Sequence, residues 1–478
     1  MVDENLADLD LAAVAAAIRD RQVTSVAVVE ACLQRITDHQ PRLNAFISVE
    51  AEAALDAAHG ADGDLADGRL RGPLHGVPLA HKDMFYRAGM VSTFGSKICR
   101  DYVPSYTGTL MTRLDAAGAI TVGALNMCEF AIGPTGHNGH FGHCRNPWNI
   151  DHISGGSSSG SGAAVAARVL HGSFGSDTGG SVRLPAGMCG VVGLKATYGV
   201  ISRYGGMPRC WSLDVFGPLA RTVMDAAILL DAVAGPDDND PTTASAPVRD
   251  YVAPLAKEAA DLRGLRVGVP VNVLLPEVEP GIRPTLDAAL DDLRALGAEI
   301  VEVTLPDTKR LHALTNIVNK AEAAALHEPW VGERPQDYAT SALSRVEAGF
   351  HIPATDYLDA IRLRPRILEE FAAAVFGSAD VLFAPVLTGP VPTIAETDIT
   401  QAGDAPRIVD SVTRCTRWVS YLGLPAMTLC GGFDGTGLPI SFQLIGRAFD
   451  EPTLLRVGHA YQGATDWHRR APQMEDTS

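Results

Sequence analysis

The sequence lacks long apolar segments, clustered cysteines and a secretory leader. No stretch approaches the roughly 18 consecutive apolar residues that a membrane-spanning helix needs, so we expect no membrane association. The eight cysteines are scattered without a C-x-x-C pair, which is typical of reduced thiols inside the cell. The N-terminal residues do not combine a basic segment with an apolar core. These absences predict a cytoplasmic location.

Basic residues are also scarce. The chain has 39 Lys and Arg against 56 Asp and Glu, a net charge of −17, and no basic run. A phosphate backbone would be repelled by this field, so we expect no nucleic acid partner. A hydrophobic fraction of 46% and a charged fraction of 20% over 478 residues are typical of a globular protein.

Apolar periodicity predicts alternating helices and strands. Residues 5–38 predict two helices, and Thr24 or Ser25 could cap the N-terminus of the second one. Residues 58–75 predict a loop. We expect strands at 77–80, 119–123, 265–270, 299–305, 381–384 and 426–429. We expect further helices at 108–117, 163–170 and 284–296 and over most of 311–375. This alternation predicts a layered α/β/α architecture.

Glycine is plentiful, and its excess lies between residues 155 and 206. Two Gly/Ser-rich loops occur there, GGSSSGSG at 155–162 and FGSDTGGSVRLP at 174–185. A phosphate-binding loop is disfavoured because neither loop ends in Gly-Lys-Ser/Thr or opens a dinucleotide-binding unit. A nucleophile elbow centred on Ser158 is disfavoured because no apolar strand leads into it.

A two-serine catalytic site is the third interpretation. Ser181 follows Thr-Gly-Gly, a loop able to direct backbone N–H groups at a developing oxyanion. Such a serine needs a base, and Lys82, at the end of a predicted buried strand, could serve if burial kept it neutral. A second serine could relay the proton. Alternatively, Lys82 could pair with Asp83 and the serines could cap turns.

Two other patterns invite chemical interpretations that we do not favour. His137, His140 and His143 have regular spacing, but intervening glycines prevent a helix from placing them on one face, so we expect no metal site. The cysteines that could act as nucleophiles have no matched base nearby in sequence; they are Cys128, Cys189 and Cys210.

The two Gly/Ser-rich loops resemble the amidase signature family over about thirty consecutive positions. The resemblance continues through GVPLAHKD at 76–83, CGVVGLKATYGVISRYG at 189–205 and LPISFQLIG at 438–446. It implies a Ser-cisSer-Lys triad with Ser181 as the nucleophile, Ser157 as the bridging serine after glycine, and Lys82 as the base. It implies oxyanion-hole amides at Thr178, Gly179 and Gly180.

The resemblance implies supporting roles for further residues. It assigns loop-orienting positions to Asp177, Arg183 and Ser158. Segments that vary among members suggest a substrate pocket that includes Met127, Cys128, Phe141 and Trp211, and the histidine loop at 136–143 would lie near it. No cofactor is implied.

The same resemblance implies the fold and the reaction. We expect one large α/β/α domain over residues 1–478, with a central mixed β-sheet covered by helices on both faces. An N-terminal helical segment would span about 1–60 and a mostly helical insertion about 306–378. The reaction would be hydrolysis of a small-molecule carboxamide to an acid and ammonia or an amine, through a seryl acyl-enzyme. A homodimer is left open.

The family also contains the glutamine-hydrolysing A subunit of tRNA-dependent amidotransferases, which is the alternative. That class usually carries Ser-Asn-Leu followed by RYDGVRYG, the expected anchor for the glutamine carboxylate. Residues 316–330 here read NIVNKAEAAALHEPW. Because the motif is missing, the sequence favours a free-standing amidase.

Overall fold

A continuous β-sheet runs through the molecule. The computed structural model describes residues 6–257, 261–401 and 403–474 of the chain. Its strands are β1 (Phe46–Val49), β2 (Pro78–Lys82), β3 (Ile120–Leu125), β4 (Gly172–Asp177), β5 (Val192–Lys195), β6 (Val215–Ala220), β7 (Arg266–Pro270), β8 (Glu299–Val303), β9 (Val381–Pro385), β10 (Ala426–Phe433) and β11 (Pro439–Ile445). They form an 11-stranded sheet in the order β1-β3-β2-β4-β6-β5-β10-β11-β9-β7-β8. Parallel pairs such as β2–β3 and antiparallel pairs such as β10–β11 make the sheet mixed, as predicted.

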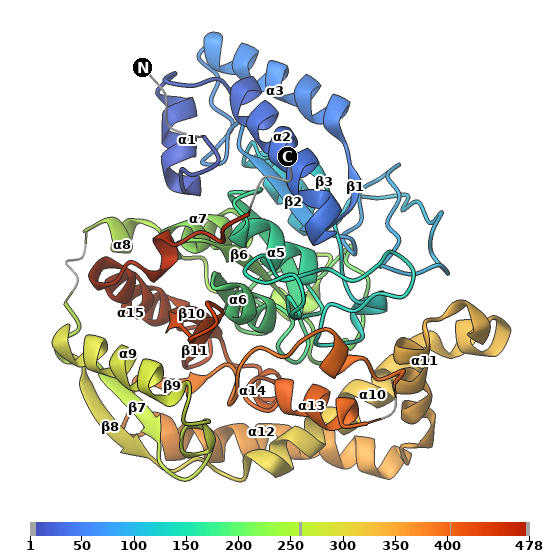
Figure 1. Cartoon of the computed structure of the whole chain (residues 1–478), viewed down its shortest axis with the longest axis vertical. Helices are drawn as coiled ribbons and strands as arrows, with labels where there is room; N and C mark the ends of the chain where they lie inside the picture. The colour runs from blue at the N-terminus through green and yellow to red at the C-terminus, as the bar shows by residue number, and fades with distance from the viewer. Residues whose placement is uncertain (1–5, 258–260, 402, 475–478) are drawn as a thin grey trace.

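Helices cover both faces of this sheet (Figure 1). They are α1 (Leu11–Arg19), α2 (Ser25–Leu43), α3 (Ala51–Ala66), α4 (Thr109–Ala116), α5 (Ser159–Ala166), α6 (Arg183–Cys189), α7 (Val223–Val233), α8 (Ala253–Lys257), α9 (Arg283–Ala295), α10 (Thr308–Glu333), α11 (Thr340–Glu347), α12 (Ala354–Phe376), α13 (Ala405–Val412), α14 (Arg417–Leu422) and α15 (Glu451–Ala464). None of these described helices is both long and apolar enough to span a membrane.

Successive side chains of each strand point to opposite faces of the sheet, so the hydrophobic core has a part on each face. The neighbouring residues Leu79 and Ala80 of β2 belong to different apolar clusters, because successive side chains of a strand point to opposite faces. Leu79 shares its cluster with residues of α1, α4, α7, α9 and α15, whereas Ala80 packs with residues of α2, α3, α5 and α6. A third cluster forms around Trp418, between α10, α12 and α14.

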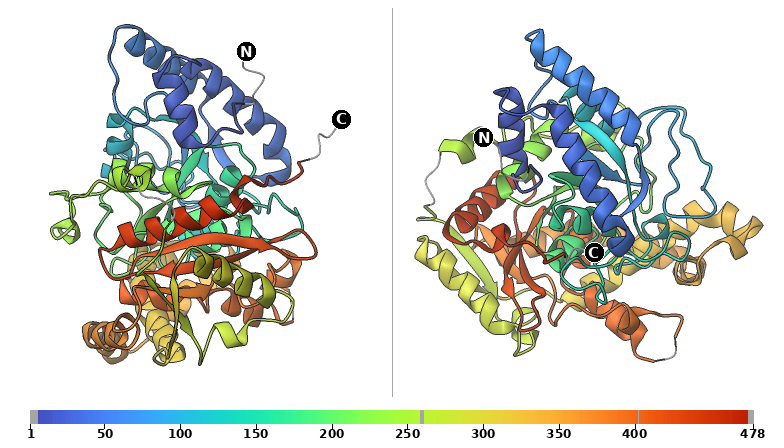
Figure 2. Two further views of the ribbon diagram at one scale, coloured as in Figure 1. Left: turned by 90° about the vertical axis from the view of Figure 1, so that its left-hand side faces the viewer. Right: turned by 45° about the horizontal axis from the view of Figure 1, so that its top comes forward.

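The first and middle parts of the chain lie toward different ends of the molecule. Helices α2 and α3 pack together over the β1–β3–β2 end of the sheet, drawn in blue in Figure 2. Helices α10 and α12, in yellow and orange, lie away from them. The loop that carries Ser181 follows β4, the fourth strand in the sheet order, and leads into α6, which lies between these two helical groups in Figure 1.

Most of the predicted elements are confirmed, including the parallel β7–α9–β8 unit and the cap at Thr24, whose Oγ1 accepts from the Ala27 amide at 3.1 Å. The loop predicted at 58–75 is wrong in its first part, since α3 continues to Ala66. Its alanines at 54, 58 and 61 recur at helical spacing and are buried, while the glycines that suggested a loop face solvent.

Candidate active site

Lys82 ends β2 and is completely buried. Its Nζ donates hydrogen bonds to Ser157 Oγ at 2.7 Å and to Ser176 Oγ at 2.8 Å. Burial lowers the pKa of Lys82 to about 7, because the interior solvates an ammonium group poorly. Asp83 faces away and accepts from the Thr93 amide at 3.0 Å, so the alternative Lys82–Asp83 ion pair is not formed in the described structure. Lys82 is thus available as a neutral amine near pH 7.

Ser157 lies in a loop before α5, and the Gly156–Ser157 peptide bond is cis. Its carbonyl oxygen accepts from the Cys128 amide at 3.1 Å. Ser158 ties the loop to β4, because its Oγ donates to the Ser176 carbonyl and accepts from the Ser176 amide, both at 3.2 Å. The lysine amine and the Ser157 hydroxyl are therefore held by two strands and a loop.

The second loop runs from the end of β4 to the start of α6 and carries the predicted nucleophile. Ser181 and Gly179 are partly exposed, whereas Thr178 and Gly180 are buried. The Ser158 amide donates to the Ser181 carbonyl at 3.3 Å, so the two loops touch. Within the described residues, however, no hydrogen bond joins the hydroxyls of Ser157 and Ser181. The structure brings Lys82 and Ser157 into direct contact, and the partly exposed Ser181 hydroxyl makes no hydrogen bond with a described residue.

A buried ion pair holds the second loop in shape. Arg183 Nε donates to Asp177 Oδ2 at 3.0 Å, and both side chains are fully buried. Burial alone would raise the pKa of Asp177, but the charge and hydrogen bonds of Arg183 hold it at about 2. The Asp177 carboxylate also accepts from the Gly180 amide at 2.7 Å. Asp177 and Arg183 thus tie the two ends of this loop to each other.

The predicted oxyanion hole is altered by that last contact. The Gly180 N–H is engaged by Asp177, so it does not face an incoming substrate. The N–H groups of Thr178 and Gly179 make no hydrogen bond among the described residues. Thr178 is fixed instead through its hydroxyl, which donates to Asp214 Oδ1 at 2.6 Å.

The model of the Amidase family matches residues 27–455. The chain belongs to the amidase family. It is 40% identical to the A subunit of the glutamyl-tRNA(Gln) amidotransferase of Azoarcus sp. (strain BH72), over 96% of this chain and 98% of that protein.

Two solved structures show the amidase likeness in three dimensions. One is a chain from a vestigial protein complex studied for the evolutionary origins of an s-triazine catabolic enzyme, with a TM-score of 0.88 and 34% identity over 95% of this chain and 98% of that one. The other is the native peptide amidase of Stenotrophomonas maltophilia, with a TM-score of 0.84 and 31% identity over 98% of this chain and 99% of that one.

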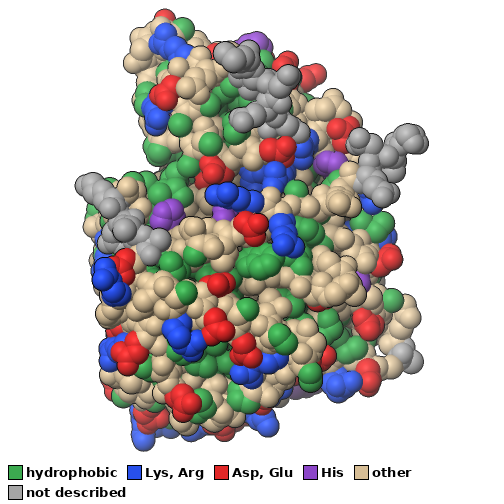
Figure 3. Space-filling view, turned by 60° about the vertical axis from the view of Figure 1, so that its left-hand side comes forward, with side chains coloured by type: hydrophobic (Ala, Val, Ile, Leu, Met, Phe, Trp, Pro, Cys, Tyr) green, Lys and Arg blue, Asp and Glu red, His purple; other side chains and the backbone are tan. Residues whose placement is uncertain are grey.

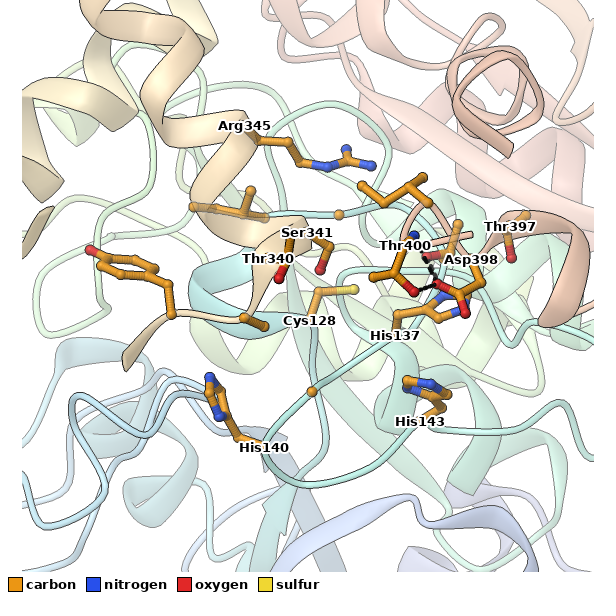
Figure 4. A pocket seen from close by; sticks show the side chains of 17 residues that line it. Cys128, His137, His140, His143, Thr340, Ser341, Arg345, Thr397, Asp398 and Thr400 are labelled. Atoms are coloured by element: carbon orange, nitrogen blue, oxygen red, sulfur yellow. Dashed lines mark hydrogen bonds between the residues drawn. The ribbon is translucent and has the colours of Figure 1, made fainter. Parts of the chain in front are cut away.

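In this member of the amidase family, one of the four predicted pocket residues lines a cavity beside the loops. Cys128 lies near the middle of the wall of a cavity of about 420 Å³, with Arg345 of α11 on one side and the His137–His143 pair on another (Figure 4). Met127 is in the core, Phe141 packs under the Arg100 guanidinium, and Trp211 lines a separate hollow at the surface.

The three histidines bind different partners. His137 contacts the Thr135 hydroxyl at 2.8 Å, and His140 Nε2 lies 3.0 Å from Glu129 Oε1. His143 Nδ1 accepts from the Asn138 amide at 3.1 Å. Over the part of the chain that the structure describes, no group of His, Cys, Asp or Glu is arranged to hold a metal ion. All three histidines line the cavity.

Sequence reasoning missed several supporting residues. Ser176, the second partner of Lys82, lies in β4, within a Gly/Ser-rich sequence where nothing in its residue type distinguishes it from its neighbours. Thr416 donates to the Gly179 carbonyl at 2.8 Å, and Ser420 accepts from Arg183 at 3.0 Å. These last contacts come from the region of α14, more than 230 residues away in sequence. No local signal could have found them.

Proposed function

We propose that this chain hydrolyses a carboxamide C–N bond through an acyl-enzyme on Ser181. The observation that carries the proposal is the buried Lys82 amine, with its pKa lowered to about 7 and its hydrogen bond of 2.7 Å to Ser157. A neutral amine in contact with a hydroxyl can accept a proton through it, which a charged lysine cannot do. The family's general amide-hydrolysing character agrees with this chemistry.

The proposed reaction has two halves. Ser181 Oγ attacks the amide carbonyl carbon while its proton passes through Ser157 to Lys82. The N–H groups of Thr178 and Gly179 stabilise the oxyanion. The proton then returns through Ser157 to the departing nitrogen, which leaves as ammonia or an amine. Water repeats the sequence, adding its hydroxyl to the acyl carbon and restoring Ser181.

Substitution of Ser181 by alanine tests the proposal. We expect Ser181→Ala to lower kcat for amide hydrolysis at least about 10⁴-fold, because the nucleophile acts as a unit with its base. Lys82→Ala added to it should cost little more. A matched control is Ser411→Ala, on an exposed position of α13. Turnover is followed by ammonia release and folding by circular dichroism; a folded Ser181→Ala protein with unchanged turnover would refute the mechanism.

An adduct test does not depend on knowing the substrate. A serine-directed phosphonate should add one phosphonyl group to the native chain, mapped to Ser181 by peptide mass spectrometry. Labelling should be lost in Ser181→Ala and persist in Ser411→Ala. Stoichiometric labelling of a different serine would assign the nucleophile elsewhere.

Whether the enzyme works alone or in a complex is a separate question with two candidate answers. The 40% identity to the A subunit of an amidotransferase over nearly the full length favours the glutamine-hydrolysing role. The missing RYDGVRYG-type motif favours a free-standing amidase. The glutamine-hydrolysing role has the stronger support, because the identity to the amidotransferase subunit extends over 96% of this chain.

The deciding experiment supplies the partners. Ammonia release from glutamine by the isolated chain is compared with release in the presence of the partner subunits of that amidotransferase and glutamyl-tRNA(Gln). Glutamine hydrolysis that depends on these additions supports the role within a complex. Rapid hydrolysis of small amides by the chain alone, unaffected by the additions, supports the free-standing amidase.

We infer a cytoplasmic location and a small-molecule amide as substrate. The eight free, buried cysteine thiols favour a reducing compartment. Acidic and basic side chains are interspersed on the face shown in Figure 3, and the net charge of −17 disfavours direct nucleic acid binding. If the role within a complex holds, contacts to tRNA would belong mainly to the partner subunits.

A further inference from the structure

An acidic side chain of α10 holds the segment that precedes β6. Glu322 is 1% exposed, and its carboxylate accepts hydrogen bonds from two elements. The Ser212 hydroxyl and amide donate to it, the latter at 3.0 Å, and the Cys210 thiol donates at 3.1 Å. From α12, the Tyr357 hydroxyl donates at 3.0 Å. Most of the donors thus belong to residues 210–212.

The donors to this buried carboxylate are all uncharged. Removing a carboxylate from water is unfavourable, and hydrogen bonds from neutral groups offset only part of that cost. An apolar side chain at position 322 would fill space between the helices without the cost. A buried charge can instead fix the geometry of the groups that donate to it. The use of Glu322 is therefore to be sought in the segment that it holds.

That segment is a turn that orients Asp214. The Asp214 amide donates to the Cys210 carbonyl at 2.9 Å. In the other direction, Asp214 Oδ2 accepts from the amides of Arg209 and Cys210, both at 2.8 Å. The turn at 209–214 is thus closed by its own hydrogen bonds and fixed from outside by Glu322.

The second oxygen of Asp214 holds the loop that carries Ser181. Asp214 is 4% exposed, and its Oδ1 accepts from the Thr178 hydroxyl at 2.6 Å. The Thr178 amide, a proposed oxyanion donor, makes no hydrogen bond with a described residue. Its direction is therefore set through the side chain of the same residue. A continuous chain of hydrogen bonds runs from Glu322 through the turn to Thr178.

We propose that Glu322 is a positioning residue, which sets the direction of the Thr178 amide through the turn at 209–214. The inference rests on the proposed function. Glu322 acts through the oxyanion donor and does not contact the substrate. Because stabilisation of an oxyanion depends closely on donor position, loss of the carboxylate slows bond formation at Ser181 and leaves ligand binding nearly unchanged. Helix α10 thereby contributes to catalysis although the proposed triad lies outside it.

An alkyl fluorophosphonate measures this effect without a known substrate. The Ser181 Oγ–P bond forms as the P–F bond breaks, the serine proton and fluoride leave as HF, and the phosphoryl oxygen takes the place of the oxyanion. Intact-protein mass spectrometry at several reagent concentrations gives the maximal rate constant, kinact, and the half-saturating concentration, KI. Glu322→Gln should lower kinact about 10- to 100-fold with KI nearly unchanged. Glu328→Gln, at an exposed position of α10, is the matched control.

A double-mutant cycle separates positioning from a general loss of packing. Thr178→Val removes the hydroxyl that Asp214 holds and keeps the shape of the side chain. If Glu322 acts through this contact, the double variant should react no more slowly than the slower single variant. Multiplication of the two effects, or an unchanged kinact in a folded Glu322→Gln protein, overturns the proposal. Should Glu322→Gln not fold, Ser212→Ala, which removes one hydroxyl donor to Glu322, takes its place in the cycle.

Hydrogen exchange separates failure of this inference from failure of the proposed function. Amide exchange in a peptide spanning residues 174–181, measured without ligand, should be faster in Glu322→Gln than in the native and Glu328→Gln proteins. If it is faster but the reagent labels a different serine, the assignment of Ser181 is wrong and Glu322 still positions this loop. If Ser181 is labelled, and both exchange and kinact are unchanged in Glu322→Gln, the positioning role is wrong and the mechanism stands.

Discussion

At the scale of single residues, the amine of Lys82 is held between two serine hydroxyls in a fully buried position. Because its pKa is lowered from 10.5 to about 7 by burial, the neutral form predominates above neutral pH. The fold alone thus gives Lys82 the lowered pKa that its proposed role as a base requires.

This arrangement predicts a pH dependence for the reaction. Protonated Lys82 cannot accept a proton, so kcat/KM for an uncharged amide should rise with pH through an apparent pKa near 7 and level off above it. An unperturbed lysine would put that rise near pH 10.5. The measurement is ammonia release between about pH 5 and 9 with a substrate that does not titrate in this range.

Three other buried groups among the described residues have pKa values near 7, and controls must separate them. Burial raises the pKa of Asp83 and of Asp225 to about 7 and lowers that of Lys195 to about 7. The variants Asp83→Asn, Asp225→Asn and Lys195→Met should keep the rise near pH 7 if Lys82 causes it. Disappearance of the rise in any of these variants would reassign it.

Residue roles are predictable where a local motif carries the information. Ser157, Ser181 and Lys82 stand in recognisable segments, so the amino-acid sequence alone points to them. The grouping of the arginines at 209, 345 and 417 around one cavity could not be found this way, since they belong to distant segments that only the folded chain brings together. The variable segment at 127–130 predicts a pocket position for both Met127 and Cys128, but side-chain direction changes from one residue to the next, and here only Cys128 faces the cavity.

At the scale of elements, β4 shows why glycine-rich segments are hard to interpret. Its residues GSFGSD are entirely buried, yet they have low strand propensity and no apolar alternation, so local patterns predict no strand there. Glycine is required at position 175 because the Ser158 side chain lies against β4. A Cβ at Gly175 would be 2.5 Å from Ser158 Oγ. The strand forms through its pairing with β2 and β6, whose contribution is invisible to a reading of β4 alone.

Helix α3 offers a stability prediction. Gly60 lies in its interior, faces solvent, and has no atom within 4 Å of the position of an added Cβ. Gly60→Ala should therefore raise the free energy of unfolding by about 0.5–1 kcal/mol, because alanine loses less backbone entropy in a helix. Chemical denaturation monitored by circular dichroism measures the difference.

A contrasting glycine provides the control for that prediction. Gly76 has φ +75°, and an added Cβ would overlap Ser25 Oγ, only 1.9 Å away. Gly76→Ala should lower the free energy of unfolding by more than about 1 kcal/mol. If both alanine variants change stability in the same direction, the conformational explanation fails.

At the scale of the whole molecule, the strands of the two halves of the chain form one continuous sheet, and the halves meet where β5 pairs with β10. Strand β5, from the first half, lies between β6 and β10, and α6 packs on β10 and β11. We propose on this basis that residues 1–478 form one amidase signature domain, with a helical segment at about 1–60 and a helical insertion at about 306–378. The mixed, helix-covered sheet was predictable from family resemblance, whereas its strand order was not, because local sequence does not encode which strands pair.

Cutting the chain tests this single-domain organisation. A protease site inserted after Val248, whose side chain is 86% exposed, should be cleaved without separating the fragments. We expect them to elute together in native gel filtration and to retain most of the amide-hydrolysing activity, since the β5–β10 pairing remains. Separation of the fragments without denaturant would indicate two independent domains.

The hydrogen bond from Arg183 to Gln443 spans 260 positions of the chain, and it has a consequence for biosynthesis. At about 5–20 residues per second, the ribosome needs roughly 10–50 s to make the partner after the arginine. During that interval the loop of Ser181 lacks its contacts to Thr416, Ser420 and Gln443, and non-local pairings of this kind form slowly. A nascent chain should consequently carry an inert serine until its final strands have emerged.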